Sequence, residues 1–141
     1  MLFILGLTVL GASVAVGCSS TGKGDSENGG REIAVDYSQS GKQIEAAPGD
    51  IIKITLDSNV TTGYQWQFLS NSNESTVSLL DHQYVEPTVS GGEPIVGAGG
   101  SEEWTFKAAG VGSSELHLEY SQPWEGGMKA EQTFDLTIVV K

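Results

Sequence analysis

Apolar and polar residues alternate along most of the chain after its first thirty residues. In five segments every second side chain is apolar, and this two-residue period is typical of strands with one buried face. The five segments are residues 52–56, 64–68, 104–108, 116–120 and 134–140. Shorter candidate strands are residues 31–36, 42–46 and 77–86. No segment has a convincing helical period, so the pattern predicts β-structure throughout.

Glycine-rich and proline-containing clusters separate the apolar segments, as expected of turns between short strands. Seven or eight short strands with turns between them predict an all-β fold, an immunoglobulin-like β-sandwich of antiparallel strands. The chain has one cysteine, Cys18, which excludes an intrachain disulfide. Sheet packing therefore has to hold the two layers together. The aromatic residues expected to face inward and form the core are Trp66, Trp104, Phe106 and Phe134.

The N-terminal part of the chain has the pattern of an export signal. Residues 1–17 are uncharged and mostly apolar, a run shorter than the ~20 residues of a membrane-spanning helix and typical of a signal peptide. The small residues before Cys18 resemble the bacterial lipoprotein signal, in which the cysteine is lipidated. Residues 18–30 have no large apolar side chain and are expected to be a disordered tether. We therefore expect a folded domain of residues 31–141 on an exported protein. It is either a cell-envelope lipoprotein, with its only membrane contact at Cys18, or a secreted or periplasmic protein.

Composition and charge exclude several classes of function. Seven Lys and Arg against 18 Asp and Glu give a net charge of −11, which disfavours binding to nucleic acid. His82 and His117 lie in predicted strands, where a structural or surface role is expected, and we expect no metal site and no cofactor. Glu102 and Glu103 begin a predicted strand and are expected to be solvated. No serine lies in a nucleophile elbow, so we expect no enzymatic activity.

Three connections between the strands are unusual in length or composition: residues 59–63, 87–100 and 122–130. A hairpin needs only ~2–5 residues, so the second and third connections are longer than strand reversal requires. Alternate connections of a sandwich emerge at the same end, so we expect all three to lie together. Pro123 stiffens the chain before Trp124. An exposed indole there favours a protein partner, and the alternative is that Trp124 caps the end of the core.

Three motifs in these connections resemble those of the chagasin family of cysteine-peptidase inhibitors. That family has an Asn-Pro-Thr-Thr-Gly-aromatic loop, a Gly-x-Gly-Gly loop and an Arg-Pro-Trp/Phe loop, in that order. The matching residues here are Asn59, Val60, Thr61, Thr62, Gly63 and Tyr64, then Gly97, Ala98, Gly99 and Gly100, then Gln122, Pro123 and Trp124. Val60 stands where the family has proline, and Gln122 stands where it has arginine. The resemblance covers essentially all of residues 31–141.

The resemblance implies a reversible inhibitor of papain-like cysteine peptidases, and we expect the protein to be a monomer. In that family the Thr-Thr loop enters the active-site cleft, so Thr61 and Thr62 would cover the catalytic Cys–His pair of the peptidase. The glycine-rich loop would lie along one side of the cleft through its backbone, and Trp124 would pack on an aromatic surface on the other side. The alternative hypothesis is a surface-tethered immunoglobulin-like adhesion or carbohydrate-binding module.

Overall fold

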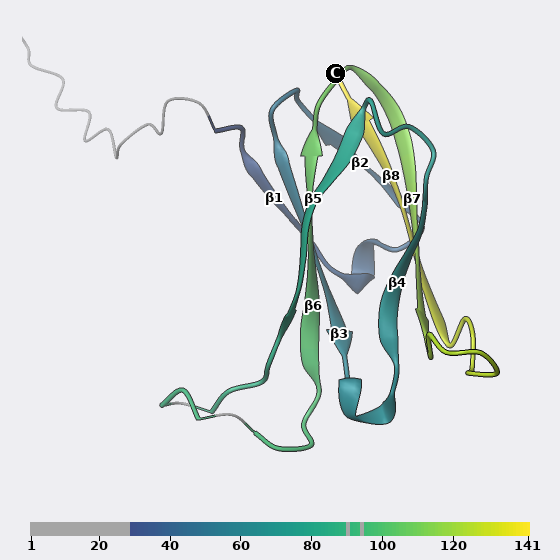
Figure 1. The fold of residues 1–141 in the computed structure, drawn as a ribbon. Coiled ribbons are helices and arrows are strands. Elements are labelled where there is room, and N and C mark those ends of the chain that lie inside the picture. The colour runs from purple at the N-terminus through teal and green to yellow at the C-terminus, as the bar shows by residue number, and fades with distance from the viewer. Residues whose placement is uncertain (1–28, 90, 94) are drawn as a thin grey trace, which may run out of the picture.

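The computed structural model describes residues 29–89, 91–93 and 95–141, and this part of the chain is all-β (Figure 1). The predicted signal peptide, Cys18 and most of the predicted tether lie outside these residues. No helix in the described ranges is long and apolar enough to cross a membrane. The strands are β1 (Glu32–Val35), β2 (Lys42–Ala46), β3 (Ile51–Ser58), β4 (Gln65–Asn71), β5 (Val77–Val85), β6 (Gly100–Ala108), β7 (Gly112–Ser121) and β8 (Gln132–Val140). Two short 3-10 helices are η1 (Tyr37–Gln39) and η2 (Val60–Thr62).

The strands form two four-stranded sheets, in the orders β1-β3-β6-β5 and β2-β8-β7-β4. The predicted β-sandwich is therefore confirmed, but the expectation that all its strands pair antiparallel is wrong at two edges. β1 pairs parallel with β3, and β2 pairs parallel with β8. The chain leaves β1 at the edge of one sheet and, after η1, enters β2 at the edge of the other. The two-residue period is the same for both directions of pairing, so it does not distinguish them.

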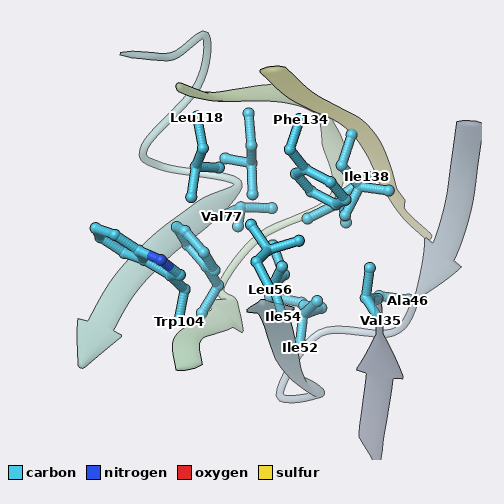
Figure 2. Packing of buried hydrophobic residues seen from close by; sticks show 14 of the residues in the cluster. Val35, Ala46, Ile52, Ile54, Leu56, Val77, Trp104, Leu118, Phe134 and Ile138 are labelled. Atoms are coloured by element: carbon cyan, nitrogen blue, oxygen red, sulfur yellow. The ribbon is translucent and has the colours of Figure 1, made fainter. Parts of the chain in front are cut away.

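The core lies between the two sheets (Figure 2). On β3 the inward residues Ile52 and Ile54 pair across the sheet with Phe106 and Trp104 of β6. The opposite sheet contributes inward residues of β4, β7 and β8, and Trp66, Leu118 and Phe134 are among them. The four aromatic residues predicted for the core are all buried. Burial of each large apolar side chain contributes about 1.5–3 kcal/mol, so this interface between the sheets stabilises the fold without a disulfide.

The three unusual connections leave the sandwich at one end, the lower end in Figure 1. They are the β3–β4 loop (59–64), the β5–β6 loop (86–99) and the β7–β8 loop (122–131). The folded part of the chain starts and finishes at the opposite end (Figure 1). There the backbone amide of Lys141 donates a hydrogen bond to the carbonyl of Ala46, at 3.0 Å. A rigid two-sheet body therefore separates the three loops from both ends of the domain.

Asp50 fixes the chain at the end opposite the loops. Its buried carboxylate accepts hydrogen bonds from the backbone amides of Ala47 and Arg31, each at 2.9 Å, and from the Arg31 guanidinium at 3.3 Å. The amide of Ala47 is the main cause that holds the pKa of Asp50 below its ordinary value of 3.8. The amide and the guanidinium of Arg31 act in the same direction, and burial opposes them. The ionised carboxylate therefore joins the start of the domain to the β2–β3 turn.

A group whose pKa is depressed in the folded state stabilises the protein above its unfolded-state pKa, and this contribution is lost as the pH falls through the folded value. We predict that the free energy of unfolding decreases below about pH 4 and that Asp50→Asn flattens this part of the profile. Urea unfolding between pH 2.5 and 6 measures the effect (range set roughly by the carboxylate pKa values). Asp81→Asn, a change at an exposed strand position, is the control. Equal slopes for wild type and Asp50→Asn would contradict the prediction.

Candidate functional site

The β3–β4 loop is a tight turn closed by its own hydrogen bonds. The side-chain oxygen of Asn59 accepts from the amide of Thr61 at 3.2 Å and from its hydroxyl at 2.6 Å. The hydroxyl of Thr62 donates to the Asn59 carbonyl at 2.6 Å, and the amide of Gly63 donates to the Val60 carbonyl at 3.0 Å. Gly63, with a φ of +80°, ends η2 in the left-handed region. These bonds hold the loop although Val60 replaces the proline of the motif, and they leave Val60, Thr61 and Thr62 exposed.

Both ends of the β3–β4 loop are attached to Tyr120 of β7. The backbone amide of Asn59 donates to the Tyr120 hydroxyl at 2.9 Å. The ring of Tyr64 stacks on the ring of Tyr120, with 5.3 Å between their centroids. Tyr120 is buried and belongs to the sheet opposite β3. The loop therefore leaves the core from a fixed base.

The β5–β6 loop lies beside the β3–β4 loop. Residues of both loops line a groove of about 200 Å³, to which Val60 and Thr61 contribute from one side and Gly97 and Ala98 from the other. The backbone amide of Ile95 donates to the carbonyl of Pro87 at 3.2 Å, and this bond joins the two sides of the β5–β6 loop. The loop projects apolar side chains into solvent, among them Val96, which is 98% exposed.

The three glycines of the segment 97–100 have different physical roles. Gly97 has a φ of +79° and no neighbouring atom where a Cβ would lie, so its backbone is open to solvent. At Gly99 a Cβ would make only ordinary contacts, the nearest at 3.5 Å from the Ser58 carbonyl. At Gly100, the first residue of β6, a Cβ would lie 2.2 Å from the Val85 carbonyl oxygen. The packing of β5 on β6 therefore accounts for Gly100, whereas no close contact requires a glycine at position 97 or 99.

The β7–β8 loop is closed by Gln122. The backbone amide of Gln122 donates to the Met128 carbonyl at 2.8 Å. The side-chain oxygen of Gln122 accepts from the backbone amide of Met128 at 3.0 Å. The ammonium of Lys129 donates to the carbonyls of Gln122 and Trp124. Pro123 and Trp124 project from this closed base, and Trp124 is 50% exposed. The half-exposed indole does not belong to the core cluster.

The β7–β8 loop contacts the β3–β4 loop directly. A Cβ placed on Gly63 would lie 2.3 Å from Cη2 of Trp124, so the indole covers the space above this glycine. The side-chain amide of Gln122 donates to the Thr62 carbonyl at 3.4 Å. The structure thus brings the predicted site residues of all three loops to one surface, with the β3–β4 loop in the middle.

Glu102 was expected to be solvated, and this prediction is wrong. Glu102 is 2% exposed and accepts hydrogen bonds from the Ser58 hydroxyl at 2.7 Å and the Trp66 amide at 2.9 Å. Its other oxygen lies 2.7 Å from Nε2 of His82. Its burial could have been predicted from its position, because Glu102 continues the two-residue period of the inward residues Trp104, Phe106 and Ala108.

Glu103 of one sheet and His117 of the other lie on the outer faces of the sandwich. Glu103 forms an ion pair with Lys53 at 3.1 Å and accepts a hydrogen bond from Gln83 at 2.8 Å. The bond from Gln83 is the main cause that lowers the pKa of Glu103, and Lys53 adds to it. His117, expected on the solvent face, pairs there with Asp135 at 2.5 Å. Within the described part of the chain, no group of three or more potential ligands could hold a metal ion.

Comparisons with known proteins agree on one family. Residues 45–138 match the model described as Chagasin family peptidase inhibitor I42. The chain is 28% identical to chagasin of Trypanosoma cruzi over 71% of this chain and 90% of that protein. It is 33% identical to amoebiasin-2 of Entamoeba histolytica over 65% of this chain and 72% of that protein. The crystal structure of the cysteine protease inhibitor EhICP2 from Entamoeba histolytica has the same fold, with a TM-score of 0.68 and 24% identity. This match covers 79% of this chain and 96% of that chain.

The contact between Gly63 and Trp124 predicts two separable effects of Gly63→Ala. A left-handed residue other than glycine costs about 1–2 kcal/mol of stability, and the new methyl group would also displace the indole. Gly41→Ala is the matched control, because Gly41 has a φ of +76° and no atom within 4 Å of the added Cβ. We expect both variants to lower the free energy of urea unfolding. Only Gly63→Ala should shift the indole N–H signal of Trp124 in a 1H–15N spectrum, and an unshifted signal would contradict the contact.

Proposed function

The chain belongs to the chagasin family of peptidase inhibitors, and from this premise we propose that its three loops reversibly block the active-site cleft of papain-like cysteine peptidases. The protein is an inhibitor and not an enzyme. Among proteins of similar structure, EhICP2 of Entamoeba histolytica is an inhibitor of cysteine proteases, which supports the same class of target here. The observation that carries the proposal is the convergence of the β3–β4, β5–β6 and β7–β8 loops at one end of the rigid sandwich (Figure 1).

In this proposal the β3–β4 loop enters the cleft, and Thr61 and Thr62 cover the catalytic residues of the peptidase. Both threonines are exposed at the tip of the turn. A peptidase cleaves a segment that lies extended in its cleft, whereas η2 is closed by bonds between residues three apart. The turn therefore fills the cleft without presenting a well-placed scissile bond. This geometry supports inhibition that is reversible and does not consume the inhibitor.

The two flanking loops extend the contact on either side. The exposed backbone at Gly97 and Gly99 suits hydrogen bonding along one wall of the cleft, and Trp124 suits an aromatic surface on the other. Interfaces of inhibitors of this kind bury ~1,600 Å² in total. Since each loop is already closed by its own hydrogen bonds, little conformational entropy is lost on binding. One domain carries all three loops, which supports action as a monomer.

The alternative of a carbohydrate-binding or adhesion module has less support. A glycan site would place aromatic rings flat along a strand face or groove. Trp124 instead stands in a loop with its six-membered ring against Gly63, beside the exposed threonine turn. This arrangement and the family of the chain both favour the inhibitor.

We further propose that the protein is exported and anchored to the cell envelope through a lipid on Cys18. The support is the apolar run of residues 1–17, the small residues before the single cysteine and the polar tether of residues 18–30. The domain starts at the end opposite the three loops (Figure 1). A tether attached there would leave the loops facing away from the membrane.

Inhibition is tested by titrating papain with the domain of residues 31–141. We expect inhibition that is reversed by dilution, with the inhibitor recovered uncleaved. Trp124→Ala should weaken binding by about 2 kcal/mol, roughly a 30-fold rise in the inhibition constant, because an exposed aromatic anchor is lost. Met128→Ala is the control, since Met128 is exposed in the same loop. No inhibition by the wild type at micromolar concentration would refute the function, and an unchanged constant for Trp124→Ala would refute the role of the indole.

Lipidation is tested by mass spectrometry of the mature protein from a bacterial host. We expect an N-terminus at Cys18 that carries acyl chains, and recovery of the protein in the membrane fraction. Cys18→Ala should remove both the modification and the membrane association. An unmodified N-terminus beyond Cys18 would refute the anchor.

A further inference from the structure

Glu102 is a buried carboxylate at the end of the sandwich from which the three loops leave. It is the third residue of β6 and therefore follows the β5–β6 loop closely. Its cross-strand partner is Leu56 of β3, so it takes the last inward position of β6 next to the core. A charged group is costly to bury unless its oxygens are paired. The partners of Glu102 therefore indicate what this carboxylate does.

One oxygen of Glu102 joins both ends of the β3–β4 loop. Oε1 accepts from the hydroxyl of Ser58, the last residue of β3, at 2.7 Å. The same atom accepts from the backbone amide of Trp66, the second residue of β4, at 2.9 Å. Ser58 and Trp66 belong to different sheets. These two bonds to one atom join the two sides of the loop base, in addition to the Tyr120 contacts and to the bond that the Trp66 indole donates to the Asp57 carbonyl at 2.9 Å.

The other oxygen joins the two strands that carry the β5–β6 loop. Oε2 lies 2.7 Å from Nε2 of His82 in β5, the strand before this loop, and Glu102 itself lies in the strand after it. The imidazole of His82 stacks on the indole of Trp104, with 3.6 Å between centroids and 14° between planes. This stacking fixes the plane of the imidazole. One carboxylate therefore connects the four strands from which the β3–β4 and β5–β6 loops leave.

A leucine at position 102 would continue the inward row of apolar residues on β6. Buried ionic groups often contribute no more to stability than apolar residues of similar volume. Hydrogen bonds to a carboxylate, however, require defined distances and directions, which apolar contacts do not. What the carboxylate adds to this end of the core is therefore a fixed relative position of the groups bound to it.

We propose that Glu102 is a positioning residue of the inhibitor, which holds the β3–β4 loop and the β5–β6 loop at the spacing at which both enter one peptidase cleft. This inference rests on the proposed function. Without the carboxylate the two loops sample other spacings, and only the fraction with the correct spacing can bind. The association rate constant kon then falls by that fraction, while the dissociation rate constant koff of the complex stays the same.

The test compares Glu102→Leu with Glu103→Leu in the full chain, with papain as the probe. Both variants replace a carboxylate by an apolar side chain that cannot accept a hydrogen bond, on adjacent residues of β6. Glu103 faces outward, where it contacts Lys53 and Gln83 and neither loop. We expect Glu102→Leu to lower kon about tenfold with koff unchanged within about twofold, and Glu103→Leu to leave both rate constants at the wild-type values.

A second variant tests whether the effect passes through the loop base. Ser58→Ala removes one donor to Oε1 and leaves the Trp66 amide and His82 in place. We expect kon to fall about threefold, and the double variant with Glu102→Leu to be no slower than Glu102→Leu alone, because both changes break the same bond. Thermal unfolding curves select an assay temperature at which every variant is folded, so a loss of stability alone leaves kon unchanged. If Glu102→Leu does not fold, Ser58→Ala carries the test.

An unchanged kon in Glu102→Leu, or an equal fall in Glu103→Leu, would overturn the positioning role. If the wild type does not inhibit papain, the proposed function fails, and amide hydrogen exchange of the free protein then decides on Glu102 separately. The amides of residues 59–64 should exchange faster in Glu102→Leu than in Glu103→Leu. Equal exchange in the two variants would also overturn the positioning role.

Discussion

The pairing of polar groups at the end of the core is the constraint on which the binding end of this protein depends. The inward rows of β3 and β6 end in Ser58 and Glu102, where apolar residues give way to groups that need partners. β4 is an edge strand, and the backbone amide of Trp66 donates to Glu102 of the opposite sheet. The loops therefore emerge from a base in which polar atoms of the two sheets are joined to one another. An apolar end to the core would pack as well but would not define the spacing of the loops.

Five of the eight strands followed from the two-residue period, because each of these has one face against the core and one toward solvent. β1, β2 and β5 were only shorter candidates, and in β5 only Val77 is buried. The period could not show that β1 and β2 pair parallel, since it is the same for both directions of pairing. It also did not identify Glu102, because a charged residue at an inward position resembles a surface residue until its partners are known. Those partners, Ser58, Trp66 and His82, are 44, 36 and 20 positions away in the sequence.

The parts of the candidate site that consist of consecutive residues were predictable from the sequence. The Asn-Val-Thr-Thr-Gly turn and the Gln-Pro-Trp segment are each recognisable from consecutive residues. The hydrogen bonds inside these two loops were not predictable from the sequence. The bonds of Asn59 and Thr62 hold the first turn without the proline of the family motif. The glycine-rich segment read as one feature in the sequence, yet Gly100 is explained by its contact with Val85, whereas Gly97 and Gly99 face open space or ordinary contacts. Such distinctions need the neighbouring strand, which no local pattern supplies.

The contact of Trp124 with Gly63 also has a consequence for the history and the re-engineering of this domain. The space taken by the indole exists only because position 63 has no side chain, so the two positions constrain each other across two loops. Neither loop is then a free module. A recombination event, or a designer who grafts the β3–β4 loop alone onto a related scaffold, separates a glycine from the aromatic ring shaped to it. The unit that can be exchanged intact is the pair of loops together.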